Sequence, residues 1–294
     1  MRIILLLCAT MFAFAGNSIF TRLALSTSDI DALSFAVIRM LSAGLLVLMI
    51  IPSDKSEQWQ PTGSRGLFLV AYALPFSYAY TFLSASLGAL VLFGTVQITM
   101  ITYAIIFRGE RLNLSQCFGF GLAITGSLML FAPSVRPPDS YLPVLIMMFA
   151  GIAWAGFSLA NPKTPLNLTG LRQVFKQAVI LSIIFYCIGI PFFSPGLDID
   201  GIVYAVLCGA LTTGMGYCLW CIVLNQISSI TAAVAQISVP VISMLLGVSL
   251  LGENVSRLEL SSASLVLLGI AIYILAKYLS ALTVDADEPM SSQK

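Results

Sequence analysis

The sequence contains no histidine, and only 9% of its 294 residues are charged. Soluble globular proteins carry about 25% charged residues. With 59% apolar residues and a mean hydropathy of +0.98, this chain has too few charges to cover its surface in water. The missing histidine also removes the commonest general base and the commonest metal ligand. The composition therefore indicates a protein whose solvent is lipid, with no metal site, no cofactor and no catalytic residues.

The remaining charges and the cysteines exclude two further classes of partner or site. The net charge is +1 and there is no basic tract, so we expect no nucleic-acid partner. The cysteines all lie in apolar runs, and we interpret them as buried packing residues: Cys8, Cys117, Cys187, Cys208, Cys218 and Cys221.

Long apolar runs fill most of the chain. A helix of about 20 apolar residues crosses the hydrocarbon core of a bilayer. The charge-poor runs are 3–21, 32–51, 66–107, 114–132, 141–160, 173–193, 201–252 and 260–282. Two of them are long enough for two spans each, with turns predicted near Ser86-Leu87-Gly88 and at 225–229. The sequence thus predicts an all-α membrane protein with ten transmembrane helices and a disordered tail over 283–294.

Lysine and arginine are unevenly distributed between the predicted loops. With the N-terminus in the cytoplasm, the inner side holds Arg2, Lys55, Arg65, Arg108, Arg111, Lys163, Arg172, Lys176, Lys277 and Lys294. The outer side holds only Arg22, Arg136 and Arg257. The positive-inside rule then places both termini in the cytoplasm.

A Gly-Glu pair recurs at half the length of the chain. Gly109-Glu110 ends one apolar run and Gly252-Glu253 ends another, 143 residues later, and each is followed 17 positions on by a glycine, Gly126 or Gly269. Because each half holds five spans, an odd number, the second half must cross the membrane in the opposite sense. We predict two inverted repeats, 1–133 and 140–282, around a central cavity, as in secondary transporters.

These features resemble the drug/metabolite transporter superfamily, EamA type. The resemblance rests on Arg39-Met40-Leu41-Ser42-Ala43, Gly109-Glu110-Arg111-Leu112, Val239-Pro240-Val241 and the two late glycines, and it covers about residues 3–281. It implies a multi-pass protein of a bacterial inner membrane, in contact with lipid and a small-molecule substrate, as a monomer or weak homodimer. The family often has proline in the middle of the fourth and ninth helices, whereas here Pro240 has Gln97 as its repeat partner.

Polar and aromatic side chains inside the spans are the candidates for substrate contact. The charge of Arg39 carries a high free-energy cost inside a membrane unless the side chain faces a cavity or a partner. It is either an anion contact or a structural latch onto helix-end carbonyls or Asp29 and Asp31. The amides Asn17, Gln97 and Gln236 either bind substrate or join helices. The aromatic residues either line the cavity or pack and anchor the helices: Tyr78, Tyr80, Trp154, Tyr217 and Trp220.

Two prolines are expected to act as hinges, Pro75 and Pro240. No Asp or Glu lies within any predicted span. Proton relays in membranes normally use buried acids or histidine. We therefore expect a facilitator or exchanger, or coupling through something other than a buried carboxylate.

The predicted function is transport of small polar organic metabolites, most plausibly amino acids or related compounds, by alternating access. Vitamins such as riboflavin, nucleotide sugars and broad drug efflux are alternatives, and the residues do not distinguish them. An intramembrane enzyme is disfavoured because the chain lacks histidine and buried acids. A channel or a membrane protein without flux is the remaining, weaker alternative.

Overall fold

The computed structural model describes residues 2–52, 64–83, 85–131, 140–159, 167–189, 196–251 and 255–287. Over these ranges the chain is helical, and no strand occurs among them. The helices of the first half are α1 (Arg2–Thr27), α2 (Ala32–Ile50), α3 (Arg65–Ala79), α4 (Ala85–Arg108) and α5 (Leu114–Phe131). Those of the second half are α6 (Leu142–Leu159), α7 (Leu168–Gly189), α8 (Ile199–Leu207), α9 (Gly216–Leu224), α10 (Ser229–Gln236), α11 (Ser238–Leu251) and α12 (Arg257–Asp287).

Eight helical segments are long and apolar enough to cross a membrane: Arg2–Thr27, Ala32–Ile50, Val91–Arg108, Leu142–Leu159, Leu168–Gly189, Ile199–Leu224, Ser229–Ser249 and Arg257–Ser280. Leu114–Leu130 is apolar but shorter, and α3 has 15 residues. Large apolar side chains are exposed around the bundle, among them Leu145 and Leu268, while polar ones such as Arg39 and Gln97 are buried. This distribution is that of a protein surrounded by lipid. The count of ten spans stays a prediction.

The helix boundaries refine the sequence prediction at three places. The first predicted turn was wrong in position: α3 ends at Ala79, where the amide of Leu83 bonds to the Ala79 carbonyl at 2.9 Å, and Ser86 already belongs to α4. The break after Leu224 is confirmed, since α10 begins at Ser229. α12 runs to Asp287, beyond the predicted end of the last span. The rest of the predicted tail lies outside the described residues.

One predicted span contains an irregular turn. Between α8 and α9 the chain forms a π-helical segment, Cys208–Met215. Single π turns inside α-helices occur often at functional sites. This segment packs on α2, where a Cβ at Gly209 would collide with the carbonyl of Arg39 and the hydroxyl of Ser42. The close approach places Cys208 beside the polar residues of α1 and α2.

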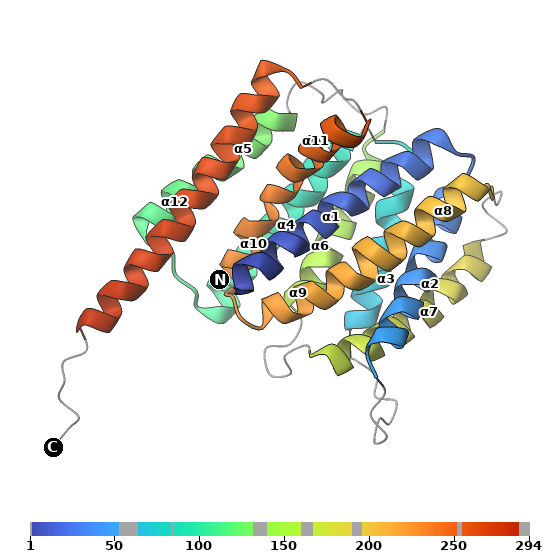
Figure 1. Ribbon diagram of the computed structural model, residues 1–294, viewed down its shortest axis with the longest axis horizontal. Coiled ribbons are helices and arrows are strands. Elements are labelled where there is room, and N and C mark those ends of the chain that lie inside the picture. The colour runs from blue at the N-terminus through green and yellow to red at the C-terminus, as the bar shows by residue number, and fades with distance from the viewer. Residues whose placement is uncertain are drawn as a thin grey trace.

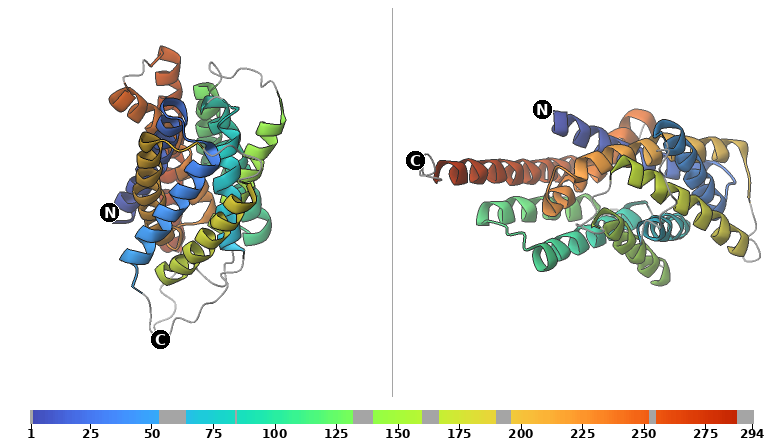
Figure 2. Two further views of the ribbon diagram at one scale, coloured as in Figure 1. Left: turned by 90° about the vertical axis from the view of Figure 1, so that its right-hand side faces the viewer. Right: turned by 90° about the horizontal axis from the view of Figure 1, so that it is seen from below.

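The helices of the first half pack mainly against helices of the second half. α3 and α4 contact α6, α2 contacts α7 and the π-helical segment, and α1 contacts α8, α9 and α11. α5 and α12 form a pair at one edge of the bundle, and the C-terminal end of α12 extends beyond it (Figures 1 and 2). Neither half therefore buries its apolar surface by itself.

Glycines allow α5 and α12 to approach closely. A Cβ at Gly126 would lie 2.7 Å from the Val266 amide nitrogen, and one at Gly269 would lie 2.6 Å from the Gly119 carbonyl. Because Gly126 meets 262–266 and Gly269 meets 119–123, the two helices run antiparallel. The contacts are reciprocal with respect to the repeat. Gly269 is the repeat position of Gly126, 143 residues later, and the segments that these two glycines meet, 119–123 and 262–266, are related by the same spacing.

The starts of α5 and α12 repeat the same capping pattern. The Asn113 side chain accepts the Gln116 amide at 2.8 Å, and the Gln116 side chain accepts the Asn113 amide at 3.1 Å. Ser256 and Glu259 exchange the equivalent bonds at 3.2 and 2.7 Å. Each pair is a capping box that satisfies amides at the start of a helix. Gly252 and Glu253, the second copy of the Gly-Glu pair, lie outside the described residues.

Gly126→Val should destabilise the protein by about 1–3 kcal/mol, because the new side chain forces α5 away from the backbone of α12. Thermal unfolding of the purified protein in detergent measures the effect. Gly121→Val is the matched control, since a Cβ there meets nothing within 4 Å. Equal melting temperatures for the two variants would show that the close contact is not needed.

Candidate functional site

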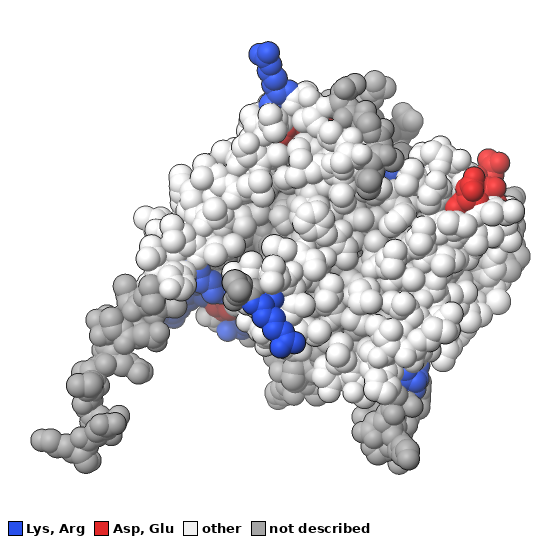
Figure 3. Space-filling view, viewed as in Figure 1, with Lys and Arg blue, Asp and Glu red and all other residues white. Residues whose placement is uncertain are grey.

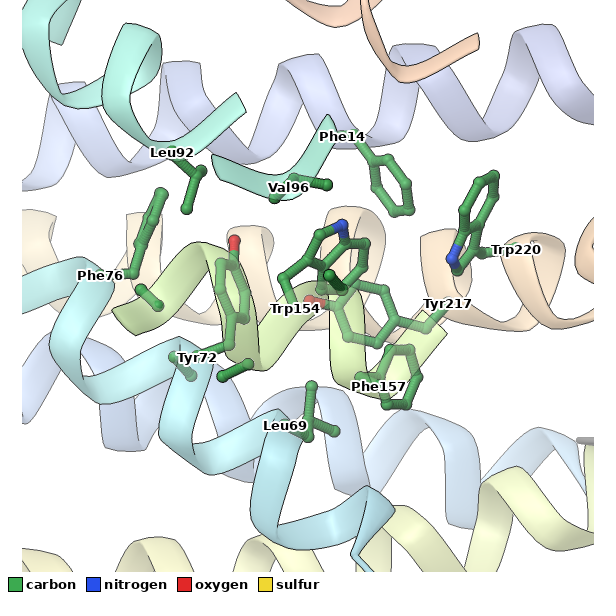
Figure 4. Packing of buried hydrophobic residues seen from close by; sticks show 14 of the residues in the cluster. Phe14, Leu69, Tyr72, Phe76, Leu92, Val96, Trp154, Phe157, Tyr217 and Trp220 are labelled. Carbon is green, nitrogen blue, oxygen red and sulfur yellow. The ribbon is translucent and has the colours of Figure 1, made fainter. Parts of the chain in front are cut away.

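Aromatic rings from both halves meet in the middle of the bundle, at the level where a central cavity is predicted. The Trp154 ring of α6 lies 5.0 Å from that of Tyr217, 5.1 Å from Tyr72 and 5.2 Å from Phe14, measured between centroids. Phe157 lies 5.5 Å from the Trp154 ring. Figure 4 shows Trp154 between Tyr72 and Tyr217, with Phe14 and Trp220 on the side of α1 and α9. We call these six residues the aromatic cluster.

Helix periodicity explains how the rings converge. Tyr217 and Trp220 are three residues apart and therefore share one face of α9, as the sequence predicts. On α3, Phe68, Tyr72, Phe76 and Tyr80 recur every fourth residue and form a stripe. The stripe continues the aromatic surface, because the Phe76 ring lies 5.2 Å from Tyr72 and 4.8 Å from Tyr80.

The polar atoms of the cluster are bound by side chains from other helices. The indole nitrogen of Trp154 donates to Gln236 Oε1 at 2.7 Å, and that of Trp220 donates to Ser158 Oγ at 3.2 Å. The Asn17 side chain donates to the Tyr72 hydroxyl at 3.4 Å. The cluster is thus apolar on its faces and polar at its tips, an arrangement suited to an amphipathic organic ligand.

Arg39 lies beside the cluster and is 1% exposed. Its guanidinium donates to Asn17 Oδ1 at 3.1 Å and to the Ala73 carbonyl at 3.2 Å. It also lies over the Phe35, Phe76 and Tyr72 rings, at 5.4–6.0 Å from their centroids. Its Nε is buried without a hydrogen-bond partner. The buried charge is thus stabilised by an amide, a carbonyl and aromatic faces.

The carboxylate partners considered for Arg39 act elsewhere or do not appear among its contacts. Asp31 accepts the Leu33 and Ser34 amides at 2.9 and 3.0 Å and caps α2. Its second oxygen accepts the Gly196 amide at 3.0 Å. Asn17 Oδ1 is shared with Cys208, whose thiol lies 2.9 Å away. In the described part of the chain, none of the contacts recorded for Arg39 is a carboxylate.

Gln97 is another buried polar group with free hydrogen-bonding capacity. It is 2% exposed, and its Nε2 has no partner. It lies on α4 next to Val96, which belongs to the same core as the aromatic cluster. Gln236, in contrast, is fully engaged: its Nε2 donates to the Ala232 carbonyl at 3.2 Å and approaches Met100 Sδ at 3.3 Å.

The structure brings together some predicted residues and not others. Trp154, Tyr217, Trp220 and Gln236 meet at the cluster, and Asn17 and Arg39 adjoin it. Tyr80 reaches it only through Phe76. Tyr78 packs on Phe82 at 5.2 Å, near the end of α3.

Both predicted hinge residues lie at irregular points of the helices. Pro75 is inside α3. Pro240 follows the break between α10 and α11 at Ile237. Whether either moves during function stays a prediction.

Sequence reasoning missed Phe14, Tyr72 and Phe157. The four-residue spacing of the α3 stripe was a usable signal for Tyr72. For Phe14 the sequence held a weaker one, because Phe14 stands at the repeat position of Trp154, in Phe14-Ala15-Gly16 and Trp154-Ala155-Gly156. The proximity of Cys208 to Asn17 depends on the π-helical turn, for which the sequence held no signal.

Comparison with known proteins agrees with this architecture. The model of the EamA-like transporter family matches residues 1–132 and 141–275. An uncharacterised protein of Pseudomonas aeruginosa is 36% identical over 281 residues, which are 94% of this chain and 95% of that protein. An uncharacterised transporter of Archaeoglobus fulgidus is 26% identical, over 92% of this chain and 98% of its own.

An Escherichia coli relative bears a more specific name, a probable amino-acid metabolite efflux pump. It is 28% identical over 231 residues, 70% of this chain and 76% of its own. A crystal structure with 18% sequence identity superimposes with a TM-score of 0.72, over 92% of this chain and 99% of the other, and shows the fold alone. The chain belongs to the EamA-like transporter family of multi-pass membrane proteins, which are transporters and not enzymes.

Proposed function

We propose that this protein is a secondary transporter that moves small polar organic metabolites, amino acids or related compounds, by alternating access. The observation that carries the proposal is the aromatic cluster between the two halves, with buried N–H groups of Arg39 and Gln97 that lack partners. Such groups are costly to leave unsatisfied in a membrane protein. A polar substrate that accepts these hydrogen bonds removes the cost while it is bound.

Internal symmetry supports inverted repeats. The reciprocal glycine contacts of α5 and α12 relate positions 143 residues apart across an antiparallel pair, as a two-fold axis in the membrane plane requires. The capping boxes at Asn113 and Ser256 obey the same spacing. The proposed arrangement is ten spans in two inverted five-helix repeats, 1–133 and 140–282, which exchange access to one central site.

Charge distribution supports the proposed orientation, with both termini in the cytoplasm of a bacterial cell. In Figure 3, Lys and Arg lie mainly along the lower edge of the bundle, and the largest acidic group lies at the upper right. The positive-inside rule assigns the lower edge to the cytoplasm. The inner membrane is then the proposed location, and a monomer or weak homodimer the proposed assembly.

The substrate class follows from the chemistry of the cluster and from the relatives. Aromatic faces beside a buried guanidinium suit an organic molecule with an anionic group. The Escherichia coli relative's name supports amino-acid metabolites. Riboflavin-like vitamins, nucleotide sugars and drugs remain the alternatives that a transport panel separates.

In proteoliposomes preloaded with unlabelled amino acids, labelled amino acids should accumulate by counterflow. Gln97→Ala and Tyr217→Ala should each lower the initial rate by about tenfold, because each removes contact with the substrate worth about 1.4 kcal/mol. Tyr278→Ala, at a side chain 61% exposed, is the control and should keep the wild-type rate. Uptake of a vitamin or nucleotide sugar instead would replace the substrate class, and no flux with any solute would refute transport.

Arg39→Met should preserve stability and abolish uptake of solutes that carry a carboxylate. Methionine fills similar volume without a buried charge, and the acceptors that Arg39 leaves keep other partners, because Asn17 Oδ1 also accepts from Cys208 and the Ala73 carbonyl from Ser77. Thermal unfolding and counterflow are measured on the same sample. A large fall in melting temperature would instead identify Arg39 as a structural latch through Asn17 and Ala73.

Transport should persist when the pH gradient is collapsed at constant substrate gradient. None of the described helices carries an Asp or Glu between its terminal turns within the predicted spans, so the interior offers no carboxylate for a proton relay. Uptake with and without a protonophore measures this. Uptake that stops with the protonophore would show proton coupling.

A further inference from the structure

The half-helix α10 is a short element between two irregular points of the chain. It has eight residues, Ser229–Gln236, and follows the break after α9. Pro240 has no amide hydrogen and cannot bond to the Gln236 carbonyl, so the helical ladder is interrupted where α11 begins. An eight-residue helix is about 12 Å long, and α10 is thus a short strut whose two ends are held separately.

The repeated Gly-Glu pair places a carboxylate at the first end of this strut. Gly109 ends α4 with a φ of 64°, a left-handed conformation that glycine adopts without steric cost. The chain then folds back, and the Glu110 amide bonds to the Ala104 carbonyl at 3.1 Å. The reversal directs the Glu110 side chain toward α10.

Glu110 binds the first amides of α10, which have no partner within their own helix. Its Oε1 accepts the Ser229 amide at 2.9 Å, and its Oε2 accepts the Ile230 amide at 3.2 Å. Ser228 caps the next amide, that of Thr231, at 3.3 Å. A carboxylate at a helix N-terminus also interacts favourably with the helix dipole. The first turn of α10 is therefore held by a residue 119 positions away in the sequence.

Two basic residues bind the side chains of the same turn. Arg108 donates to Ser229 Oγ at 2.7 Å and to the Leu159 carbonyl at the end of α6 at 3.1 Å. Lys277 of α12 donates to Ser228 Oγ at 2.7 Å and to Thr231 Oγ1 at 2.6 Å. Helices α4, α6 and α12 are thereby joined at the start of α10.

The other end of α10 is bound to the aromatic cluster. Gln236, its last residue, accepts the hydrogen bond of the Trp154 indole at 2.7 Å. A substrate that takes the place of Gln236 at Trp154 frees this end of the strut. The same short helix thus connects the proposed substrate site with the charged contacts of Glu110, Arg108 and Lys277.

We propose that Glu110, with Arg108 and Lys277, is a latch that holds α10 in the closed position at one end of the bundle, and that α10 transmits the state of the aromatic cluster to this latch. Glu110 is then a positioning residue for transport. The inference deepens the proposed function and rests on it, because the latch must open once in each transport cycle.

Ordinary helix capping is the simpler interpretation, and Glu259 provides the comparison. Glu259 also binds an amide at a helix start, that of Ser256 at 2.7 Å, but it belongs to the same helix that it caps. Glu110 instead comes from the opposite half of the chain. A cap stabilises only its own turn, whereas a latch couples two distant ends.

Hydrogen–deuterium exchange of the full-length protein in nanodiscs tests the latch without any substrate. Glu110→Ala should accelerate exchange of the α10 amides by about tenfold or more, because a charge-assisted contact is lost. Glu259→Ala should leave α10 at the wild-type rate. If Glu110→Ala does not fold, Glu110→Gln is measured in its place and should give a smaller acceleration in α10. Unchanged exchange in α10 would overturn the latch.

The coupling has its own test in the same assay. Gln236→Ala cuts the contact with Trp154 and should accelerate exchange at Ser229 and Ile230, at the far end of the strut. If Ser229 and Ile230 exchange at the wild-type rate in this variant, Glu110 is only a helix cap, and α10 does not transmit the state of the aromatic cluster. These results stand apart from the proposed function, which fails only if the wild-type protein shows no flux.

Discussion

The hydrogen bond between the Trp154 indole and Gln236 joins the aromatic cluster to the short helix α10. In lipid a buried polar atom has no water to bind, so its partner fixes the position of the helix that carries it. Breaking this bond leaves two polar groups unsatisfied unless a ligand replaces one of them. On the proposal made above, the position of α10 depends on what occupies the cluster.

The same constraint explains why the two halves are inseparable. Arg39 of α2 donates to Asn17 of α1 and to the Ala73 carbonyl of α3, and Cys208 of the π-helical segment, which belongs to the second half, also contacts Asn17. α5 and α12 meet through glycines that face each other's backbone. Each half supplies contacts that the other half lacks. The two halves can therefore move relative to each other only if contacts between their helices are exchanged for others. We expect that exchange at α10, because polar contacts with other helices hold both of its ends.

Much of this architecture is readable from the sequence, because the bilayer imposes a length and a polarity on every span. The apolar runs, the break at 225–229 and the repeat spacing of 143 residues all follow from composition and pattern. Trp154, Tyr217, Trp220 and Gln236, which meet at the cluster, were among the residues that the sequence offered as candidates for substrate contact.

Other features of the site depend on which helices pack against each other. These long-range contacts cannot be read from the pattern of a single sequence. Glu110 was recognised as a repeat marker, yet its partners lie 119 and 120 residues away. The π-helical turn at 208–215 has no propensity signal of its own. Tyr72 was not among the predicted site residues, although its four-residue spacing from Phe68, Phe76 and Tyr80 indicates a shared helix face.

The most direct test of the central claim is the fluorescence of Trp154 during substrate binding. A variant that retains Trp154 as its only tryptophan is titrated in detergent with a solute that the wild-type protein transports. We expect a saturable change in emission, because the solute replaces Gln236 at the indole nitrogen, and the same titration in a Gln236→Ala background should start from the shifted spectrum. Robust transport of that solute with unchanged Trp154 emission would contradict a substrate site at the aromatic cluster.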